Sequence, residues 1–289
     1  MADIKEIVNE IGELETLRTV TQAYSEIASL RMRTIRDFVL KNRDFLGAID
    51  SIFRQVLYSY QEEVEELIKN TKDKDKVTFL AHNGKTVAVL LSANTGLYGD
   101  IVSKTFNKFL KEVEKANVEV SIVGKLGASL FEQTKPNTPF TYFDFPDYQI
   151  DSKALTEIIR HIVQYEKIEV YYGKFMSVVT QSPSVYTINA ITTNTIQGAQ
   201  AEEKKEKYIF EPTLEEVLRF FETEIFTSLF DQTIRESQLA KFASRIGAMS
   251  QATENISENI KNAENKRLKV IHSIANRKQL NSLSRLLIR

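Results

Sequence analysis

The sequence predicts an α/β protein in which two long terminal helices form an antiparallel coiled coil around a small Rossmann-like domain with a mostly parallel sheet. All five prolines lie between residues 136 and 212, so neither end of the chain contains the residue that most strongly breaks helices. Apolar residues recur at three- and four-residue steps in both end segments. Between residues 76 and 193 short apolar runs alternate with amphipathic stretches. These observations predict a helix over 1–70, an α/β domain over 71–212 and a second helix over 213–289.

The N-terminal helix has an apolar stripe that is expected to face the C-terminal helix. It begins at Ile4, Ile7, Val8, Ile11 and Leu14. Farther along it continues, with small slips, through Val20, Tyr24, Ile27, Ile35, Phe38, Phe45, Ile49, Phe53 and Val56.

The C-terminal helix has steps that alternate more regularly between three and four residues. Its stripe consists of Leu239, Phe242, Ile246, Met249, Thr253, Ile256, Ile260, Ala263, Arg267, Val270 and Ile274. This repeat favours a left-handed coiled coil, and helices that begin and end one chain pair most simply antiparallel. At a rise of about 1.5 Å per residue, each helix would reach roughly 100 Å. Gly247 is expected to permit a close approach of the partner helix, and Pro212 at an early position or Thr213 as a cap begins this helix.

The middle segment reads as alternating strands and helices, which is typical of a parallel sheet. The expected strands are 76–82, 85–93, 118–125, 168–175 and 184–191. The expected helices are 99–116 and 152–166, the latter capped by Asp151 or Ser152. Residues 197–208 read as an exposed polar loop.

The composition offers little chemistry. A net charge of −1 gives no case for nucleic acid as a partner. The chain has no cysteine, and its three histidines, His82, His161 and His272, are far apart, so we expect no catalytic residue, metal or cofactor. The N-terminus lacks the pattern of a signal peptide, and no run approaches the roughly 20 apolar residues of a membrane span, so we expect a cytoplasmic protein.

Two glycine-containing turns follow predicted strands, where an α/β domain could bind phosphate. They are "SANTGLYGD" (92–100) and "VGKLGASLF" (123–131). Neither has the glycine spacing of a dinucleotide or P-loop motif. Tight turns with close backbone packing are therefore favoured over nucleotide binding.

Several of these stretches, in order, resemble the gamma subunit, the central rotating shaft, of F-type rotary ATP synthases. The resemblance rests on "TVTQAYSEIASLRMR", "SANTGLYGDI", "VGKLGASLF", "VYYGKFMSVVTQSP", "YIFEPTLEEVL" and "SRIGAMSQATENI". It implies a non-catalytic rotor whose coiled coil lies inside a hexamer of catalytic and non-catalytic nucleotide-binding subunits. It further implies an epsilon-like small subunit and a membrane ring of c subunits as partners, in a complex on the inner face of the cell membrane.

The resemblance also assigns contacts to individual residues. Arg245 matches the family's shaft arginine, Tyr24 stands where the family usually has methionine, and His272 falls on its Arg-Gln pair; these would contact the hexamer. Tyr208 and Glu211 match the segment that touches the membrane ring. Residues 233–289 contain eleven Lys or Arg against four Glu, which suits an acidic sleeve.

Departures from the family pattern support a second interpretation. Tyr98 replaces a cysteine, and the last residues, "SLSRLLIR", replace an ending rich in glycine and alanine. The chain could then be a gamma-like shaft of a specialised motor ATPase that lacks a membrane ring. A third interpretation, an α/β nucleotide-binding enzyme with coiled-coil arms, is opposed by the missing glycine motifs.

Overall fold

The chain folds into two compact units, which are described separately. A computed structural model describes residues 2–60, 83–114, 118–189, 211 and 213–287. The helical unit comprises residues 1–30 and 245–289, and the mixed unit comprises residues 31–244. In chain order the elements are α1 (Ala2–Ser59), β1 (Thr86–Leu91), α3 (Ile101–Val113), β2 (Glu119–Val123), α4 (Lys125–Thr134), β3 (Thr141–Phe143), α5 (Ser152–Ile162), β4 (Lys167–Phe175), β5 (Gln181–Asn189) and α7 (Leu214–Leu287).

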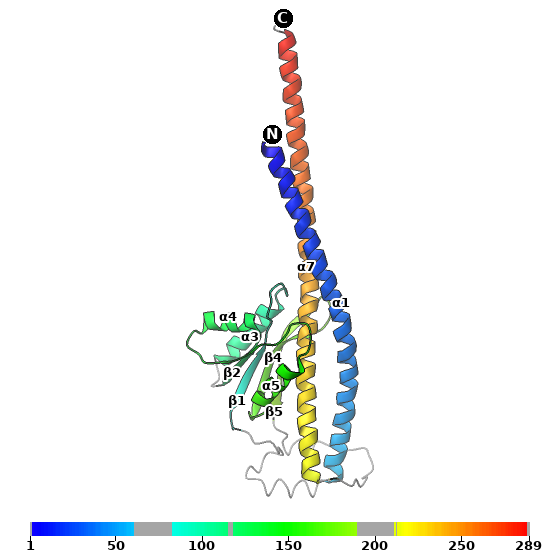
Figure 1. Cartoon of the computed structure of the whole chain (residues 1–289), viewed down its shortest axis with the longest axis vertical. Helices are drawn as coiled ribbons and strands as arrows, with labels where there is room; N and C mark the ends of the chain where they lie inside the picture. Colours follow the sequence, from blue (N-terminus) through cyan, green and yellow to red (C-terminus); the bar gives the residue numbers. More distant parts are fainter. Residues whose placement is uncertain (1, 61–82, 115–117, 190–210, 212, 288–289) are drawn as a thin grey trace. The chain divides into compact units, whose positions relative to one another are not determined.

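The helical unit is an antiparallel pair made by the first half of α1 and the second half of α7, which lie side by side (Figure 1). Ile7 and Ile11 of α1 pack in one cluster with Ile260 and Ala263 of α7. Farther along α1, the hydroxyl of Thr21 lies 2.9 Å from that of Thr253, which comes earlier in α7. The residue numbers of the contacts increase along α1 while they decrease along α7, and this confirms the predicted antiparallel pairing.

Two expectations about this pair are wrong in detail. Val20, Tyr24 and Ile27 are not buried in the seam, because these residues are 45%, 37% and 44% exposed, although the Tyr24 ring still touches Arg245 of α7. Ala28, which is fully buried, follows one residue after Ile27, so the seam has moved to a neighbouring phase of the helix. Gly247 does not admit a close neighbour either, since a Cβ placed there would meet nothing within 4 Å.

The mixed unit contains a five-stranded sheet in the order β3-β2-β1-β4-β5. The pairs β3–β2, β2–β1 and β1–β4 are parallel, and only β4–β5 is antiparallel. β1 lies at the centre, where Val89 pairs with Ser121 on one side and Val170 on the other. This confirms the mostly parallel sheet, but β3 and α4 were not among the expected elements.

Helices cover both faces of the sheet: Val87–Leu91 of β1 are all apolar and buried, and they alternate between two cores. One core joins Ala88 and Leu90 to the buried side chains of α3 and α4, including Phe109 and Phe131. The other core joins Val87, Val89 and Leu91 to side chains of α5 and of the first half of α7; those of α7 are Phe226, Phe230 and Ile234. α7 therefore supplies part of the core of the sheet before it enters the helical unit.

The predicted helix starts have the expected chemistry. The Asp151 carboxylate accepts hydrogen bonds from the backbone N–H groups of Lys153 and Ala154, which caps α5. The Thr213 hydroxyl accepts from the N–H of Glu216, at 3.3 Å, so Thr213 caps α7.

Some expectations fall on residues that the structure does not describe. They are the strand over 76–82, the polar loop over 197–208 and the predicted domain boundary after residue 70. Across the described residues, none of the helices is both long and apolar enough to span a bilayer.

Candidate functional site

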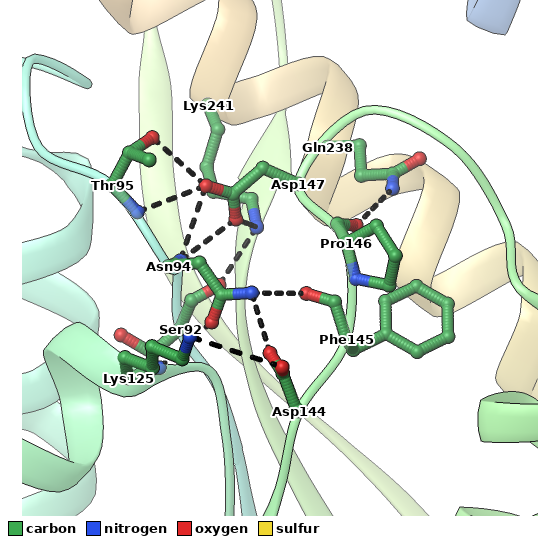
Figure 2. A network of polar contacts seen from close by, with 10 residues as sticks. All are labelled: Ser92, Asn94, Thr95, Lys125, Asp144, Phe145, Pro146, Asp147, Gln238 and Lys241. Carbon is green, nitrogen blue, oxygen red and sulfur yellow. Dashed lines mark hydrogen bonds and ion pairs between the residues drawn. The ribbon is translucent and has the colours of Figure 1, made fainter.

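Three parallel strands end at one edge of the sheet, which is where α/β folds usually bind ligands. Ser92 follows β1, Gly124 follows β2 and Asp144 follows β3. In this chain the edge is filled by a polar network that also includes residues of α7 (Figure 2).

Asp147 is the hydrogen-bond acceptor at the centre of this network, and it is only 3% exposed. Its carboxylate accepts from the Asn94 N–H at 2.9 and 3.1 Å, from the Thr95 N–H at 3.0 Å and from the Thr95 hydroxyl at 2.9 Å. Such multiple donation to one carboxylate compensates for the hydration that it loses on burial.

The Asn94 side chain connects the ends of the three strands. Its amide nitrogen donates to the Asp144 carboxylate at 2.7 Å and to the Phe145 carbonyl at 3.1 Å. Its amide oxygen accepts from the N–H of Lys125, the first residue of α4, at 2.9 Å. The backbone N–H groups that could bind a phosphate here, those of Asn94, Thr95 and Lys125, are thus bonded within the chain.

Lys241 of α7 places a positive charge in the network, and it is 7% exposed. The ammonium donates to the Ser92 carbonyl at 2.7 Å and lies 3.7 Å from Asp147 Oδ1. Gln238, one turn earlier on the helix, donates to the Pro146 carbonyl at 3.4 Å. The buried carboxylate and ammonium compensate each other, which a buried charge requires.

The turn before α3 packs directly on α7. Gly99 has φ +62°, and a Cβ there would lie 2.5 Å from the Ser244 hydroxyl and 3.0 Å from its carbonyl oxygen. The ring of Tyr98, 2% exposed, meets Phe242 edge-to-face at 6.1 Å between centroids. Gly124 has φ +103°, and a Cβ there would be 2.8 Å from the Ala93 nitrogen. Both glycine-containing segments are therefore the closely packed turns that the sequence favoured, and we name Asn94, Thr95, Tyr98, Gly99, Asp147 and Lys241 the α7 joint.

In the helical unit, the structure brings two of the predicted hexamer-contact residues together. The guanidinium carbon of Arg245 lies 5.6 Å from the centroid of the Tyr24 ring, which is a cation–π geometry. Arg245 is 6% exposed, whereas Tyr24 is 37% exposed. The ring therefore presents the accessible surface of this pair.

The other predicted contact residues lie elsewhere. His272 is exposed on α7, more than seven helical turns beyond Arg245. Glu211 is exposed just before α7, and Tyr208 lies outside the described residues. Among the residues that the structure describes, no group of His, Asp and Glu is placed to hold a metal ion. His161 lies in α5 with its Nε2 3.2 Å from the Ser121 hydroxyl, and burial lowers its pKa.

Sequence reasoning missed two features. One is an exposed apolar stripe on α1, formed by Leu17, Val20, Tyr24 and Ile27 at steps of three and four residues. Val20, Tyr24 and Ile27 were recognised as apolar steps but were assigned to the seam, and Leu17 was not singled out. The other is the α7 joint, whose partners are separated by about 50 to 150 positions, so that no local spacing signals it.

Comparisons with known proteins agree with one another. A family model described as ATP synthase matches residues 3–269. The chain is 24% identical over 262 residues to an ATP synthase gamma chain of Mycoplasma mycoides, with 88% of each chain covered. It is 24% identical over 271 residues to the ATP synthase gamma chain of Ruthia magnifica, with 90% of each covered.

Solved structures show the same fold. One from the central stalk and c-ring of the Tetrahymena thermophila mitochondrial ATP synthase matches with a TM-score of 0.56 and 16% identity, over 81% of this chain and 99% of that one. Another, from the Euglena gracilis mitochondrial ATP synthase, matches with a TM-score of 0.55 and 13% identity, over 88% and 93%. The family match, which spans most of the sequence, and the coiled-coil architecture together show that the chain belongs to the ATP synthase family, as a non-catalytic central-stalk subunit of the F-type complex.

Proposed function

We propose that the helical unit of this chain turns inside a sleeve of catalytic and non-catalytic nucleotide-binding subunits, that Tyr24 and His272 contact that sleeve, and that Arg245 supports the contact by holding Tyr24. The observation that carries the proposal is the exposed apolar stripe of Leu17, Val20, Tyr24 and Ile27. A continuous apolar stripe on a helix that is already paired is a mark of a further protein partner.

The character of this surface suits a contact that must be made and released repeatedly. The stripe has a single apolar residue at each step of three or four positions, and the α7 face of the unit carries exposed polar residues, namely Ser250, Asn255 and Glu258. An extensive hydrophobic interface would bind the helical unit too strongly at one rotational position. A narrow apolar stripe surrounded by polar residues binds weakly at each rotational position. The excess of basic residues over 233–289 adds a screened attraction to acidic neighbours.

Within the proposed contact, Arg245 acts through Tyr24. Its guanidinium faces the tyrosine ring, and its burial leaves the ring as the accessible group. Removal of the guanidinium would release the ring to other rotamers, so the partner would meet a less ordered surface.

The test is ATP hydrolysis and rotation of the hexamer assembled with the chain. We expect Arg245→Ala to lower rotation-coupled hydrolysis by about fivefold or more, which corresponds to a loss of about 1 kcal/mol at the contact. The matched control is Arg160→Ala, which removes an exposed arginine of α5. Circular dichroism of each isolated variant checks that it remains folded. If Arg245→Ala behaves like Arg160→Ala, the contact does not depend on Arg245.

The remaining partners belong to the same proposal. Tyr208 and Glu211 would touch the c subunits of a membrane ring, an epsilon-like subunit would bind the chain, and the complex would lie on the inner face of the cell membrane. These assignments rest on the family match over residues 3–269 and on the two structural neighbours, which come from ATP synthase assemblies that contain a c-ring. Purification of the native complex tests them: a co-purifying proteolipid ring supports a synthase, whereas a complex without a ring supports the alternative of a specialised motor ATPase.

A further inference from the structure

We propose that the α7 joint is a torsional lock, which prevents α7 from turning about its own axis against the sheet when the chain carries torque. This inference rests on the proposed function, because only a rotor loads the helix in this way. It assigns that load to particular contacts of the mixed unit, with Lys241 as the central positioning residue.

The apolar contacts between α7 and the sheet are unsuited to resisting rotation. Phe226, Phe230 and Ile234 pack on the sheet face through apolar surface. Hydrophobic contact is non-directional, so a helix that slides or turns slightly exchanges one apolar neighbour for another at small cost. Those residues can hold α7 on the sheet without fixing its angle.

The polar contacts of the joint are directional. Lys241 reaches from α7 to the Ser92 carbonyl at 2.7 Å and to the Asp147 carboxylate at 3.7 Å. Both acceptors are themselves held: Ser92 donates its N–H to Val123 at 2.9 Å, and Asp147 accepts from Asn94 and Thr95. Hydrogen bonds weaken steeply as their angle changes, so rotation of the helix would break this set rather than slide along it.

Close packing between α7 and the turn before α3 also opposes rotation of the helix, beside the polar contacts. Gly99 approaches Ser244 so closely that a Cβ at Gly99 would lie 2.5 Å from the hydroxyl and 3.0 Å from the carbonyl oxygen. One turn earlier on α7, Ala240 faces Gly173 of β4, where an added Cβ would lie 3.4 Å from the Ala240 Cβ. α7 thus meets a tightly fitting turn at Ser244 and an ordinary packing contact at Ala240, and close-packed interiors transmit strain with little compliance.

The helix continues from the joint without a break to Leu287. An angle that is fixed at Lys241 and Ser244 would therefore be passed on through the same continuous helix. The lock needs no second connection through α1.

The lock can be measured as the torsional stiffness of the chain within the assembled hexamer. The chain has no cysteine, so Glu132→Cys on the exposed side of α4 provides its one thiol for attaching a bead. With the hexamer arrested by nucleotide, the angular variance of the bead is inversely proportional to the stiffness between α4 and the sleeve. We expect Lys241→Met to increase that variance by about twofold or more, because it removes the hydrogen bond to the Ser92 carbonyl and the ion pair with Asp147 while keeping the bulk of the side chain.

Two further variants separate the lock from folding. Lys241→Met alone leaves Asp147 buried without its counterion, so the double variant Asp147→Asn with Lys241→Met removes both charges and avoids the uncompensated buried carboxylate of the single variant. The control Lys153→Met removes an exposed lysine of α5. We expect the double variant, but not the control, to show the increased variance.

The outcomes distinguish this proposal from the proposed function. If the parent chain assembles and turns but the double variant has the same angular variance, the joint is not a lock. If the parent chain does not turn in the hexamer at all, the rotor function itself is wrong. An increased variance in Lys153→Met would also overturn the lock, because the effect would not belong to Lys241.

Discussion

Replacement of Phe230 by alanine should weaken the attachment of α7 to the sheet more than any change to its exposed surface. Phe230 is fully buried in the core that α7 shares with α5 and β1, and its ring is stacked on that of Phe226 with centroids 6.5 Å apart. Truncation of a buried phenylalanine removes its transfer free energy and leaves a cavity, which together cost about 4 kcal/mol. The sheet should then open more readily.

Amide hydrogen exchange of β1 measures this change directly, because Thr86–Leu91 is the central strand and exchanges only when the sheet opens. A loss of about 4 kcal/mol corresponds to roughly a thousandfold faster exchange in the regime where exchange reports the opening equilibrium. Phe220→Ala is the matched control: Phe220 is on the same helix but 63% exposed, so its removal should change the exchange rate less than about threefold. If Phe230→Ala accelerates exchange of β1 by less than about tenfold, α7 is not an integral part of this core.

Four further predictions concern single positions. Gly99→Ala should destabilise the mixed unit by more than about 1 kcal/mol in urea denaturation, because it combines a positive φ with a collision at Ser244; an unchanged midpoint would show that the turn can move away from α7. Gly247→Ala should have the opposite sign and stabilise the helical unit by about 0.5–1 kcal/mol, since the site is helical and open. A loss of stability measured by circular dichroism would mean that a neighbour does approach Gly247. Ile260→Ala should cost about 2–4 kcal/mol in thermal unfolding of the coiled coil, whose cluster it anchors, and a cost under about 1 kcal/mol would count against that seam. Burial lowers the pKa of His161, so the folded chain binds fewer protons than the unfolded chain, and stability should be full above about pH 6.5 and decrease below it. Urea denaturation at pH 7.5 and 5.5 should show this decrease in the parent chain and a smaller one in His161→Gln; equal decreases would assign it to other groups.

The fold could be predicted where local patterns suffice. An almost continuous apolar strand such as β1 and an amphipathic helix such as α3 are recognisable from the sequence alone, and proline-free ends with three- and four-residue steps indicated the long helices. β3 was missed because it has only three residues, fewer than any periodicity can reveal. α4 was interpreted as the end of a turn because Gly124 and Gly127 dominate its beginning.

The phase of the seam could not be read in the same way. Val20, Tyr24 and Ile27 continue the apolar steps that begin at Ile4, but the paired helices meet through smaller neighbours such as Thr21 and Ala28. The sequence shows that two adjacent faces of this helix carry apolar or small residues. Which of the two faces is buried depends on how the partner helix packs against it.

The α7 joint lies beyond sequence reasoning for a different reason. Asp147 belongs to an irregular segment after β3, and Lys241 lies in a helix where a lysine normally reads as a solvated residue. Their pairing depends on which helix covers the carboxyl ends of the strands, and this is a property of the whole fold.

The buried pair of Asp147 and Lys241 also limits the routes by which this sequence can evolve. Loss of either partner alone leaves an uncompensated charge in the interior, at a cost of about 3–5 kcal/mol, whereas exchange of both for neutral side chains is close to free. Each single variant is thus less stable than both the parent chain and the double variant that connects to it. Descendants of this chain should therefore keep both residues or lose both, and a lineage that carries only one should also carry a nearby change that supplies the missing charge or removes the need for it.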